Sequence, residues 1–211
     1  MKRKFIILMG KSASGKSTIA SELVTRFGFK KYRTITTRPK RDGESNLDYI
    51  FVDDKKFWKW EMKGKFIENM AYHTEVGGIS ATWNYATPKI RKWSFSIMPE
   101  TYVVVLTPCG ARKFVDYYGV ENCKVVYLDT DETVRTIRAK KRGSFDETEW
   151  NRRLITDSRD FSSKALAKCF KENEYIKIKN NKNDLGFAMV MIEKARCGLS
   201  EQGRAKCHSL L

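Results

Sequence analysis

Residues that commonly build metal centres and membrane segments are scarce in this chain. Among its 211 residues there are only two histidines and five cysteines. The cysteines form no C-x2-C pair, and no Cys/His spacing suits zinc, so we expect reduced, mostly structural thiols. No apolar run approaches the ~20 residues that a membrane-spanning helix requires. These absences argue against a zinc protein and against a protein that crosses a membrane.

The beginning of the chain has a superficial likeness to a secretory leader, because basic residues at Met1–Lys4 precede the apolar run Phe5–Met9. That run is too short for a leader and passes directly into a glycine-containing loop. The sequence also lacks internal repeats and low-complexity blocks. We therefore expect a cytoplasmic protein with no membrane partner.

Acidic residues are in deficit: 25 Asp and Glu stand against 41 Lys and Arg, which gives a net charge of +16. Such an excess attracts polyanions, whether nucleotides, nucleic acid or an anionic membrane surface. The basic residues are spread along the chain, with no run longer than that at Lys140–Arg142, and they form no dedicated stripe. We therefore do not expect specific nucleic-acid binding.

The apolar pattern predicts an α/β protein. The content of 41% hydrophobic and 12% aromatic residues is ordinary for one globular core, with or without small inserted lobes. Strands and helices are expected to alternate around a mainly parallel sheet. The expected strands are Phe5–Met9, Tyr102–Leu106, Val125–Leu128 and Tyr175–Lys179, and the expected helices are Lys16–Arg26 and Asp184–Ala195.

The segment Gly10–Ser17 fits the phosphate-binding pattern G-x4-G-K-[ST] behind an apolar strand. Glycines let the backbone turn its N–H groups toward phosphates, Lys16 neutralises the β and γ oxygens, and the Ser17 hydroxyl can ligate Mg2+. The pattern predicts a site for a nucleoside triphosphate. Its expected contacts are Gly10, Ser12, Ala13, Ser14, Gly15, Lys16, Ser17 and Thr18.

A second block of residues resembles the guanylate kinase family. Thr36–Glu44 follows that family's T-T-R-x-x-R-x-G-E, and Asp48–Phe51 follows its D-Y-x-F. The resemblance implies that Arg38, Arg41 and Tyr49 bind the phosphate of an acceptor nucleotide, which two guanidinium forks suit well. The alternative is that the arginines are solvated loop charges.

Further matches concern the base of the acceptor. The family's G-E-F-I-E corresponds to Gly64–Glu68, and its Y-G-[ST] corresponds to Tyr85–Thr87. The resemblance therefore implies substrate contacts at Glu68, Tyr85 and Thr87, and at Thr34, where the family often has a serine. Thr87 has an alternative role as the N-cap of a helix whose first residue is Pro88.

A third block, Arg138–Gly143, resembles the family's R-x-x-x-R-G lid, with Arg153 as the later arginine. On a helix Arg138 and Arg142 share one face, so both could hold the transferring phosphoryl oxygens. A solvated basic helix end is the alternative. Asn180 corresponds to a family asparagine near the adenine of ATP.

The chain departs from the family where the acceptor base is recognised. The family's D-x-D is replaced by Val105–Thr107, Ala86 replaces a glycine, and Thr74–Ala81 forms an apparent insertion. These departures spare the residues that handle phosphate. The reaction is therefore better supported by the sequence than the identity of its substrate.

The resemblance implies an ATP- and Mg2+-dependent nucleoside monophosphate kinase of purine nucleotide metabolism, acting on GMP or dGMP as a monomer or homodimer. The catalytic residues would be Lys16, Arg38, Arg138, Arg142 and Arg153. Altered or broad base specificity is one alternative, and a catalytically inactive guanylate-kinase-like binding module is another.

The resemblance also implies one guanylate-kinase-like domain over residues 1–195 on a P-loop core. The core would comprise residues 1–33, 88–137 and 159–195. A small β-rich acceptor lobe would occupy 34–87, a short helical lid 138–158, and a tail 196–211.

Overall fold

A five-stranded parallel sheet forms the centre of the protein, in the order β2-β7-β1-β8-β9. The computed structural model describes residues 4–40, 49–76, 79–90, 100–141, 145–181 and 192. The strands are β1 (Phe5–Met9), β2 (Lys30–Lys31), β7 (Tyr102–Val105), β8 (Cys123–Asp129) and β9 (Tyr175–Lys179). The α/β fold and its parallel sheet, expected from the apolar runs, are confirmed.

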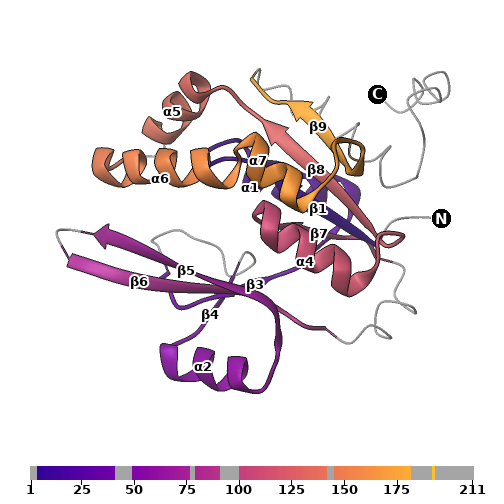
Figure 1. Cartoon of the computed structure of the whole chain (residues 1–211), viewed down its shortest axis with the longest axis horizontal. Coiled ribbons are helices and arrows are strands. Elements are labelled where there is room, and N and C mark those ends of the chain that lie inside the picture. Colours follow the sequence, from indigo (N-terminus) through magenta and orange to yellow (C-terminus); the bar gives the residue numbers. More distant parts are fainter. Residues whose placement is uncertain are drawn as a thin grey trace.

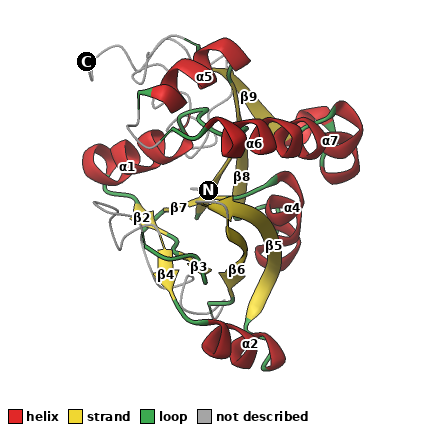
Figure 2. Ribbon diagram, turned by 90° about the vertical axis from the view of Figure 1, so that its left-hand side faces the viewer, coloured by secondary structure: helices red, strands yellow, loops and turns green. Residues whose placement is uncertain are grey.

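Alternation along β1 explains why both faces of this sheet are covered. Phe5, Ile7 and Met9 join the cluster that includes side chains of α4 (Pro108–Tyr118). The intervening Ile6 and Leu8 pack with α1 (Lys16–Phe27) on the opposite face. Figure 2 shows α1 on one side of the sheet and α4 on the other. A strand buried on both sides needs this continuous apolar sequence.

Residues 34–88 build a separate four-stranded sheet in the order β4-β3-β6-β5. Its elements are β3 (Thr34–Thr36), β4 (Tyr49–Phe51), α2 (Asp54–Met62), β5 (Phe66–Val76) and β6 (Ile79–Pro88). Helix α2 was not predicted from the sequence. Its N-cap is Asp53, which accepts a hydrogen bond from the Lys56 amide and was an available signal. Phe57 on α2 is buried against the sheet.

The apparent insertion at Thr74–Ala81 is part of a long antiparallel hairpin. β5 and β6 stay paired from Glu68 opposite Thr87 to Val76 opposite Ile79. In Figure 1 this hairpin extends away from the parallel sheet and lies below α6. The extra residues therefore lengthen two existing strands, and Thr74 of β5 lies beside Glu149 of α6.

Two tyrosine hydroxyls fasten the hairpin's base to the parallel sheet. Tyr32 donates a hydrogen bond to the carbonyl oxygen of Pro88, and its hydroxyl lies 3.0 Å from that of Tyr118. The Tyr118 hydroxyl is 3.2 Å from both the amide nitrogen and the carbonyl oxygen of Ile90. Burial is the main cause that raises the pKa of Tyr118 to about 12, and burial raises the pKa of Tyr32 as well. Both hydroxyls therefore keep their protons at neutral pH and can donate these bonds.

Between β8 and β9, the described part of the chain forms α5 (Glu132–Lys140), α6 (Glu147–Asp160), α7 (Ser163–Cys169) and the 3-10 turn η1 (Glu172–Glu174). Asp146 caps α6 by accepting a hydrogen bond from the Glu149 amide. Ser162 caps α7 in the same way. The helix expected at Asp184–Ala195 and the tail 196–211 lie outside the described residues, except for Ile192.

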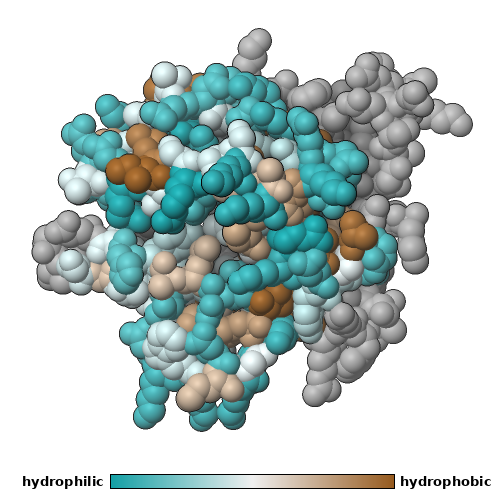
Figure 3. Space-filling view, viewed as in Figure 1, coloured by the Kyte–Doolittle hydropathy of each residue, from teal (hydrophilic) through white to brown (hydrophobic). Residues whose placement is uncertain are grey.

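The surface seen in Figure 3 is mostly hydrophilic, with hydrophobic residues in small separate groups. Within the described ranges, every helix is too short or too polar to traverse a bilayer. Among the described residues on this face, none of these groups forms a broad apolar patch.

Candidate functional site

The loop between β1 and α1 has the backbone geometry of an anion cradle. Gly15 has a left-handed φ of 96°, and a Cβ there would lie 2.7 Å from Nδ2 of Asn180. Ala13 adopts a left-handed φ of 58°, which costs a non-glycine residue ~1–2 kcal/mol. The Lys16 ammonium donates to the carbonyl oxygens of Gly10 and Lys11, each at 2.7 Å. The cation is thus held inside the loop's curve, where a phosphate would meet it.

Asn180 supports the loop from behind. Its side-chain amide donates to the carbonyl oxygen of Ser14 at 2.8 Å, and Asn180 is 4% exposed. The Thr130 hydroxyl donates to the same oxygen at 3.3 Å. Arg138 donates to the Asn180 carbonyl at 2.9 Å, which brings an expected catalytic arginine next to Gly15. The position of Asn180 therefore gives it a structural role in the loop.

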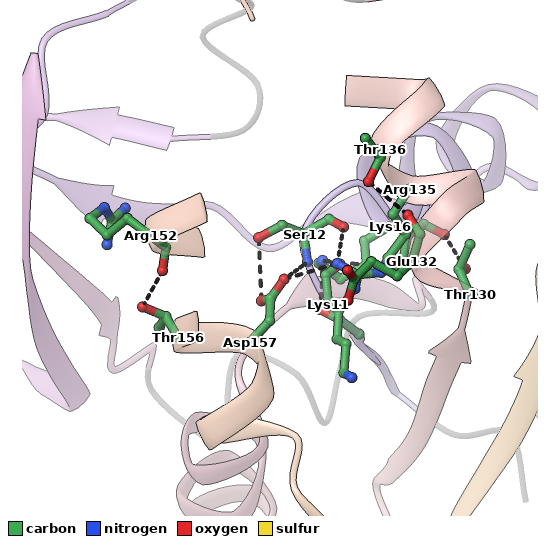
Figure 4. A network of polar contacts seen from close by, with 12 residues as sticks. Lys11, Ser12, Lys16, Thr130, Glu132, Arg135, Thr136, Arg152, Thr156 and Asp157 are labelled. Atoms are coloured by element: carbon green, nitrogen blue, oxygen red, sulfur yellow. Dashed lines mark hydrogen bonds and ion pairs between the residues drawn. The ribbon is translucent and has the colours of Figure 1, made fainter. Parts of the chain in front are cut away.

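An ion pair behind the loop was missed by sequence reasoning. Asp157 of α6 accepts hydrogen bonds from the Ser12 amide at 2.8 Å and the Ser12 hydroxyl at 3.3 Å. Arg135 of α5 donates to that carboxylate at 3.2 Å and to the Ser12 carbonyl at 3.3 Å. Figure 4 shows the Asp157 carboxylate facing Ser12, with Arg135 beyond it. The partners of this pair lie 22 residues apart, so no local sequence pattern connects them. The charges spaced along the helices near the expected lid were the only available signal.

Arg38 lies at the opposite side of the site and is 4% exposed. Its guanidinium carbon is 5.6 Å from the ring centroids of both Tyr49 and Phe51. Nη1 donates to the carbonyl oxygen of Pro39 at 2.6 Å. Aromatic faces and a carbonyl therefore fix the guanidinium at the edge of the four-stranded sheet.

Glu68 and Thr87 face each other across β5 and β6, and the Thr87 hydroxyl donates to the carboxylate at 2.6 Å. Burial raises the pKa of Glu68, while the Thr87 hydroxyl and Lys113 oppose that shift. The alternative role of Thr87 as a helix N-cap is wrong, because both Thr87 and Pro88 belong to β6. Instead, the Thr87 hydroxyl orients the partly buried Glu68 carboxylate from the neighbouring strand.

Arg153 is held by Glu149, one turn earlier on α6, through its Nε at 2.7 Å. Glu149 also accepts two bonds from Arg152, at 2.6 and 2.8 Å, and one from the Thr74 hydroxyl of β5 at 3.1 Å. The two arginines lower the pKa of Glu149 to about 2 despite its partial burial. Glu149 therefore connects the hairpin to the arginines of α6.

One cleft of 370 Å³ runs between the phosphate loop and the four-stranded sheet. Of the expected site residues, it is lined by Gly10, Ser12, Lys16, Ser17, Thr34, Arg38, Tyr49, Glu68, Tyr85 and Arg153. Val105 and Thr107, which replace the family's acidic pair, also line it. Sequence reasoning missed the lining residues Tyr72 and Trp83, whose alternation on the hairpin was the available signal.

Some expected residues lie beside the cleft or beyond description. Arg138, Asn180 and Thr87 lie behind its walls, as their contacts above show, and Thr18 is exposed on the first turn of α1. Arg41 and Arg142 lie outside the described residues. The remaining loop positions, Ala13, Ser14 and Gly15, form the turn that carries Lys16.

Cation ligands are sparse in the described part of the chain, which holds no group of three or more His, Cys, Asp or Glu suited to a metal. Ser17 supplies an exposed hydroxyl at the start of α1 and at the edge of the cleft. Mg2+ is typically held by few protein oxygens together with substrate phosphates and water. A lone hydroxyl beside a phosphate loop fits that mode, and it does not fit an all-protein metal site.

Comparison with known proteins agrees with this arrangement. A family described as an AAA domain matches residues 6–159. A guanylate kinase of Desulfotalea psychrophila is 32% identical over 150 residues, which cover 69% of each chain. A guanylate kinase of Rubrobacter xylanophilus is 34% identical over 114 residues, and the match spans about half its length, 54%, and 52% of this chain.

A solved structure agrees at the level of the fold. The crystal structure of guanylate kinase from Anaplasma phagocytophilum superposes with a TM-score of 0.63 at 21% identity, covering 93% of this chain and 86% of that one. Together with the phosphate loop and the matching arginine blocks, these likenesses show that the chain belongs to the guanylate kinase family.

Proposed function

We propose that the protein is a nucleoside monophosphate kinase that transfers the γ-phosphoryl group of ATP to GMP or dGMP. In this proposal residues 34–87 form the acceptor lobe and 138–158 the lid, and the remaining residues of 1–195 form the core. The products are ADP and the nucleoside diphosphate.

A single observation carries the proposal: one cleft is lined both by the phosphate loop and by the nearly buried Arg38. Lys16 and Ser17 line one end, and Arg38 with Tyr49 lines the other. A protein that only hydrolysed ATP would have no need of a buried, oriented guanidinium at the far end. Two phosphate sites in one cleft suit transfer between two nucleotides.

The residues of the cleft can supply what phosphoryl transfer needs, which is alignment and charge stabilisation with no covalent intermediate. Lys16 would hold the β and γ oxygens of ATP, and Arg38 would hold the acceptor phosphate. Arg153, fixed by Glu149, would face charge that develops on the moving group. Arg138 donates to the Asn180 carbonyl behind the loop and would have to turn into the cleft to do the same. Mg2+ bound at Ser17 would neutralise phosphate charge.

Guanine is the base favoured by the hydrogen-bonding groups. Glu68 and Thr34 both line the cleft, and a carboxylate can accept from the N–H groups of a guanine edge. A relaxed base preference is the second candidate. It is favoured by Val105 and Thr107, which put no acidic group where the family has two.

ADP release from MgATP, measured in parallel with GMP, dGMP, AMP, dTMP, UMP and CMP, tests both candidates. We expect activity with GMP and dGMP only. Activity with several bases would support the relaxed enzyme. No ADP release with any monophosphate would overturn the kinase proposal and favour the inactive binding module.

Lys16→Ala is the blank for that assay. Because it removes a preorganised cation, we expect kcat to fall by about 10²–10³-fold, the cost of one oxyanion donor. Lys11→Ala is the matched control in the same loop, since Figure 4 shows its side chain pointing away from the contacts around Ser12. Equal losses in both variants would contradict the role given to Lys16.

A further inference from the structure

Two thiols from different helices meet where α4 and α7 come together. The Sγ atoms of Cys109 and Cys169 are 3.4 Å apart, although the residues are 60 positions apart in the chain. Cys109 is in the first turn of α4, and Cys169 is the last residue of α7. The expectation of structural thiols fits Cys123, which is buried in β8, and it does not account for this pair.

The two thiols differ in their access to solvent. Cys109 is exposed, whereas Cys169 is 7% exposed and packs into the core. A peroxide would therefore reach Cys109 first, and Cys169 is placed to react with the product. This arrangement of an accessible thiol beside a resolving thiol is typical of redox-sensitive cysteines.

We propose that Cys109 and Cys169 form a reversible disulfide when a peroxide oxidises the protein, and that this bond cross-links α4 to α7. The sulfur atoms would have to approach from 3.4 Å to the ~2.05 Å of a disulfide, a small shift for two helix ends. The adjacent Arg112 guanidinium lies 5.5 Å from the Phe170 ring, so α4 and α7 are already packed at this point.

The chemistry balances as a two-electron oxidation. Hydrogen peroxide accepts two electrons from the Cys109 thiolate and leaves a sulfenic acid and hydroxide. The Cys169 sulfur then attacks the Cys109 sulfur, the S–O bond breaks, and the hydroxyl leaves with the Cys169 proton as water. One peroxide is consumed per disulfide, and a dithiol reductant reverses the product.

The surroundings of Cys169 set the rate of the second step. Burial raises the pKa of Cys169 to about 11, and the neighbouring Cys109 thiol adds to that shift. Arg112 of α4 and Lys168 of α7 oppose it. The thiol is therefore protonated at neutral pH, so closure of the disulfide should accelerate as pH rises toward 11.

The first turn of α4 also touches the acceptor side of the cleft. A Cβ added at Gly110 would lie 3.3 Å from Cδ of Glu68, and Thr107 lines the cleft. Drawing Cys109 toward α7 would displace this turn relative to Glu68. Resting on the proposed function, this contact predicts a several-fold higher KM for GMP in the oxidised protein, with the KM for ATP unchanged.

Peptide mapping of the intact protein after one equivalent of hydrogen peroxide tests the bond itself. We expect a cross-linked peptide pair containing Cys109 and Cys169, which a dithiol reductant separates. Cys109→Ser and Cys169→Ala should each abolish the pair, and the first of these changes only an exposed side chain. Cys197→Ser/Cys207→Ser, in which the tail has no thiol, should retain it.

Links from Cys109 to any other cysteine, or its oxidation to sulfinic acid with Cys169 still free, would overturn the inference. The mapping does not depend on activity, so it stands even if the reduced protein phosphorylates no monophosphate. An unchanged KM for GMP in a fully cross-linked sample would refute the coupling to Glu68.

Discussion

At the scale of single residues, Asp157 illustrates a contact that determines the shape of the phosphate loop from outside it. Its carboxylate receives the Ser12 amide and the Arg135 guanidinium, and both charged side chains are nearly buried. The Nε of Arg135 has no partner among the described residues. Glu132 also faces this guanidinium, at 3.6 Å, but it is exposed to solvent, so Asp157 is the main group that compensates the buried positive charge.

Asp157→Ala should lower the free energy of unfolding by about 3–5 kcal/mol, because it leaves the buried Arg135 charge with only the exposed Glu132 carboxylate as an ionic partner. Urea denaturation measures the change. Asp116→Ala is the matched control, since its pair with Arg112 is exposed and should contribute ~1 kcal/mol or less. Adding Arg135→Leu should recover much of the loss, and a loss under ~1 kcal/mol in Asp157→Ala would disprove the compensating role.

Residues that act through local spacing were predictable, and residues that act through tertiary contacts were not. Lys16 and Ser17 follow from a pattern of eight residues, and Arg38 from the block after β3. By contrast, Asp157 and Ser12 are separated by 145 positions, so no local pattern connects them. The roles of the expected catalytic and binding residues remain predictions until variants are assayed.

At the scale of secondary-structure elements, α6 and the hairpin are joined through Glu149. Its low pKa shows that the folded protein favours the ionised form. A carboxylate whose folded pKa lies below its ordinary value of 4.5 stabilises the fold above that value. The stabilisation disappears as pH falls to about 2.

Glu149→Gln should therefore be less stable than the wild type at pH 6, with the difference shrinking as pH falls from 4.5 to about 2. Urea denaturation across this range measures it. Glu147→Gln, which removes an exposed charge in the same turn, is the control. A difference between Glu149→Gln and the wild type that is constant with pH would argue against the ion pairs.

The boundaries of several elements were predicted well because each has a strong local signal. The buried strands, for example, are continuous apolar runs. The extended hairpin was interpreted only as an insertion. Gly77-Gly78 between two alternating segments was the missed sequence signal for a hairpin. Helix α2 was missed because its many aromatics also favour strands.

At the scale of the whole molecule, the parallel order of the sheet could be expected from the alternation of strands and helices, but the pairing of strands could not. β2, for example, has only two residues, Lys30 and Lys31, and pairs with β7 about seventy positions later in the chain. A pair of lysines has no strand signature. Tertiary context alone makes them part of the sheet.

The net charge of +16 is a property of the whole chain, and its most direct effect should be on the capture of nucleotides. Positive potential speeds the encounter with anions, and salt screens it over ~8–10 Å. For the proposed kinase, kcat/KM for GMP should fall steadily as KCl is raised from 20 to 300 mM, on the order of severalfold. Steady-state kinetics at each salt concentration measures this, and a kcat/KM insensitive to salt would rule out electrostatic capture.

The long hairpin also has a dynamic consequence. Its base is fastened by Tyr32 and Tyr118, whereas near its far end the Thr74 hydroxyl reaches Glu149 through one hydrogen bond. A hydrogen bond to a charged group contributes about 1.5–3 kcal/mol, so the state in which this bond is broken should have a population of roughly 0.6 to 8 per cent. Relaxation-dispersion NMR of the Thr74 methyl group would detect that population, and Thr74→Val should enlarge it. The hairpin would then move away from α6 spontaneously, so that substrate entry would draw on thermal motion already present in the empty protein.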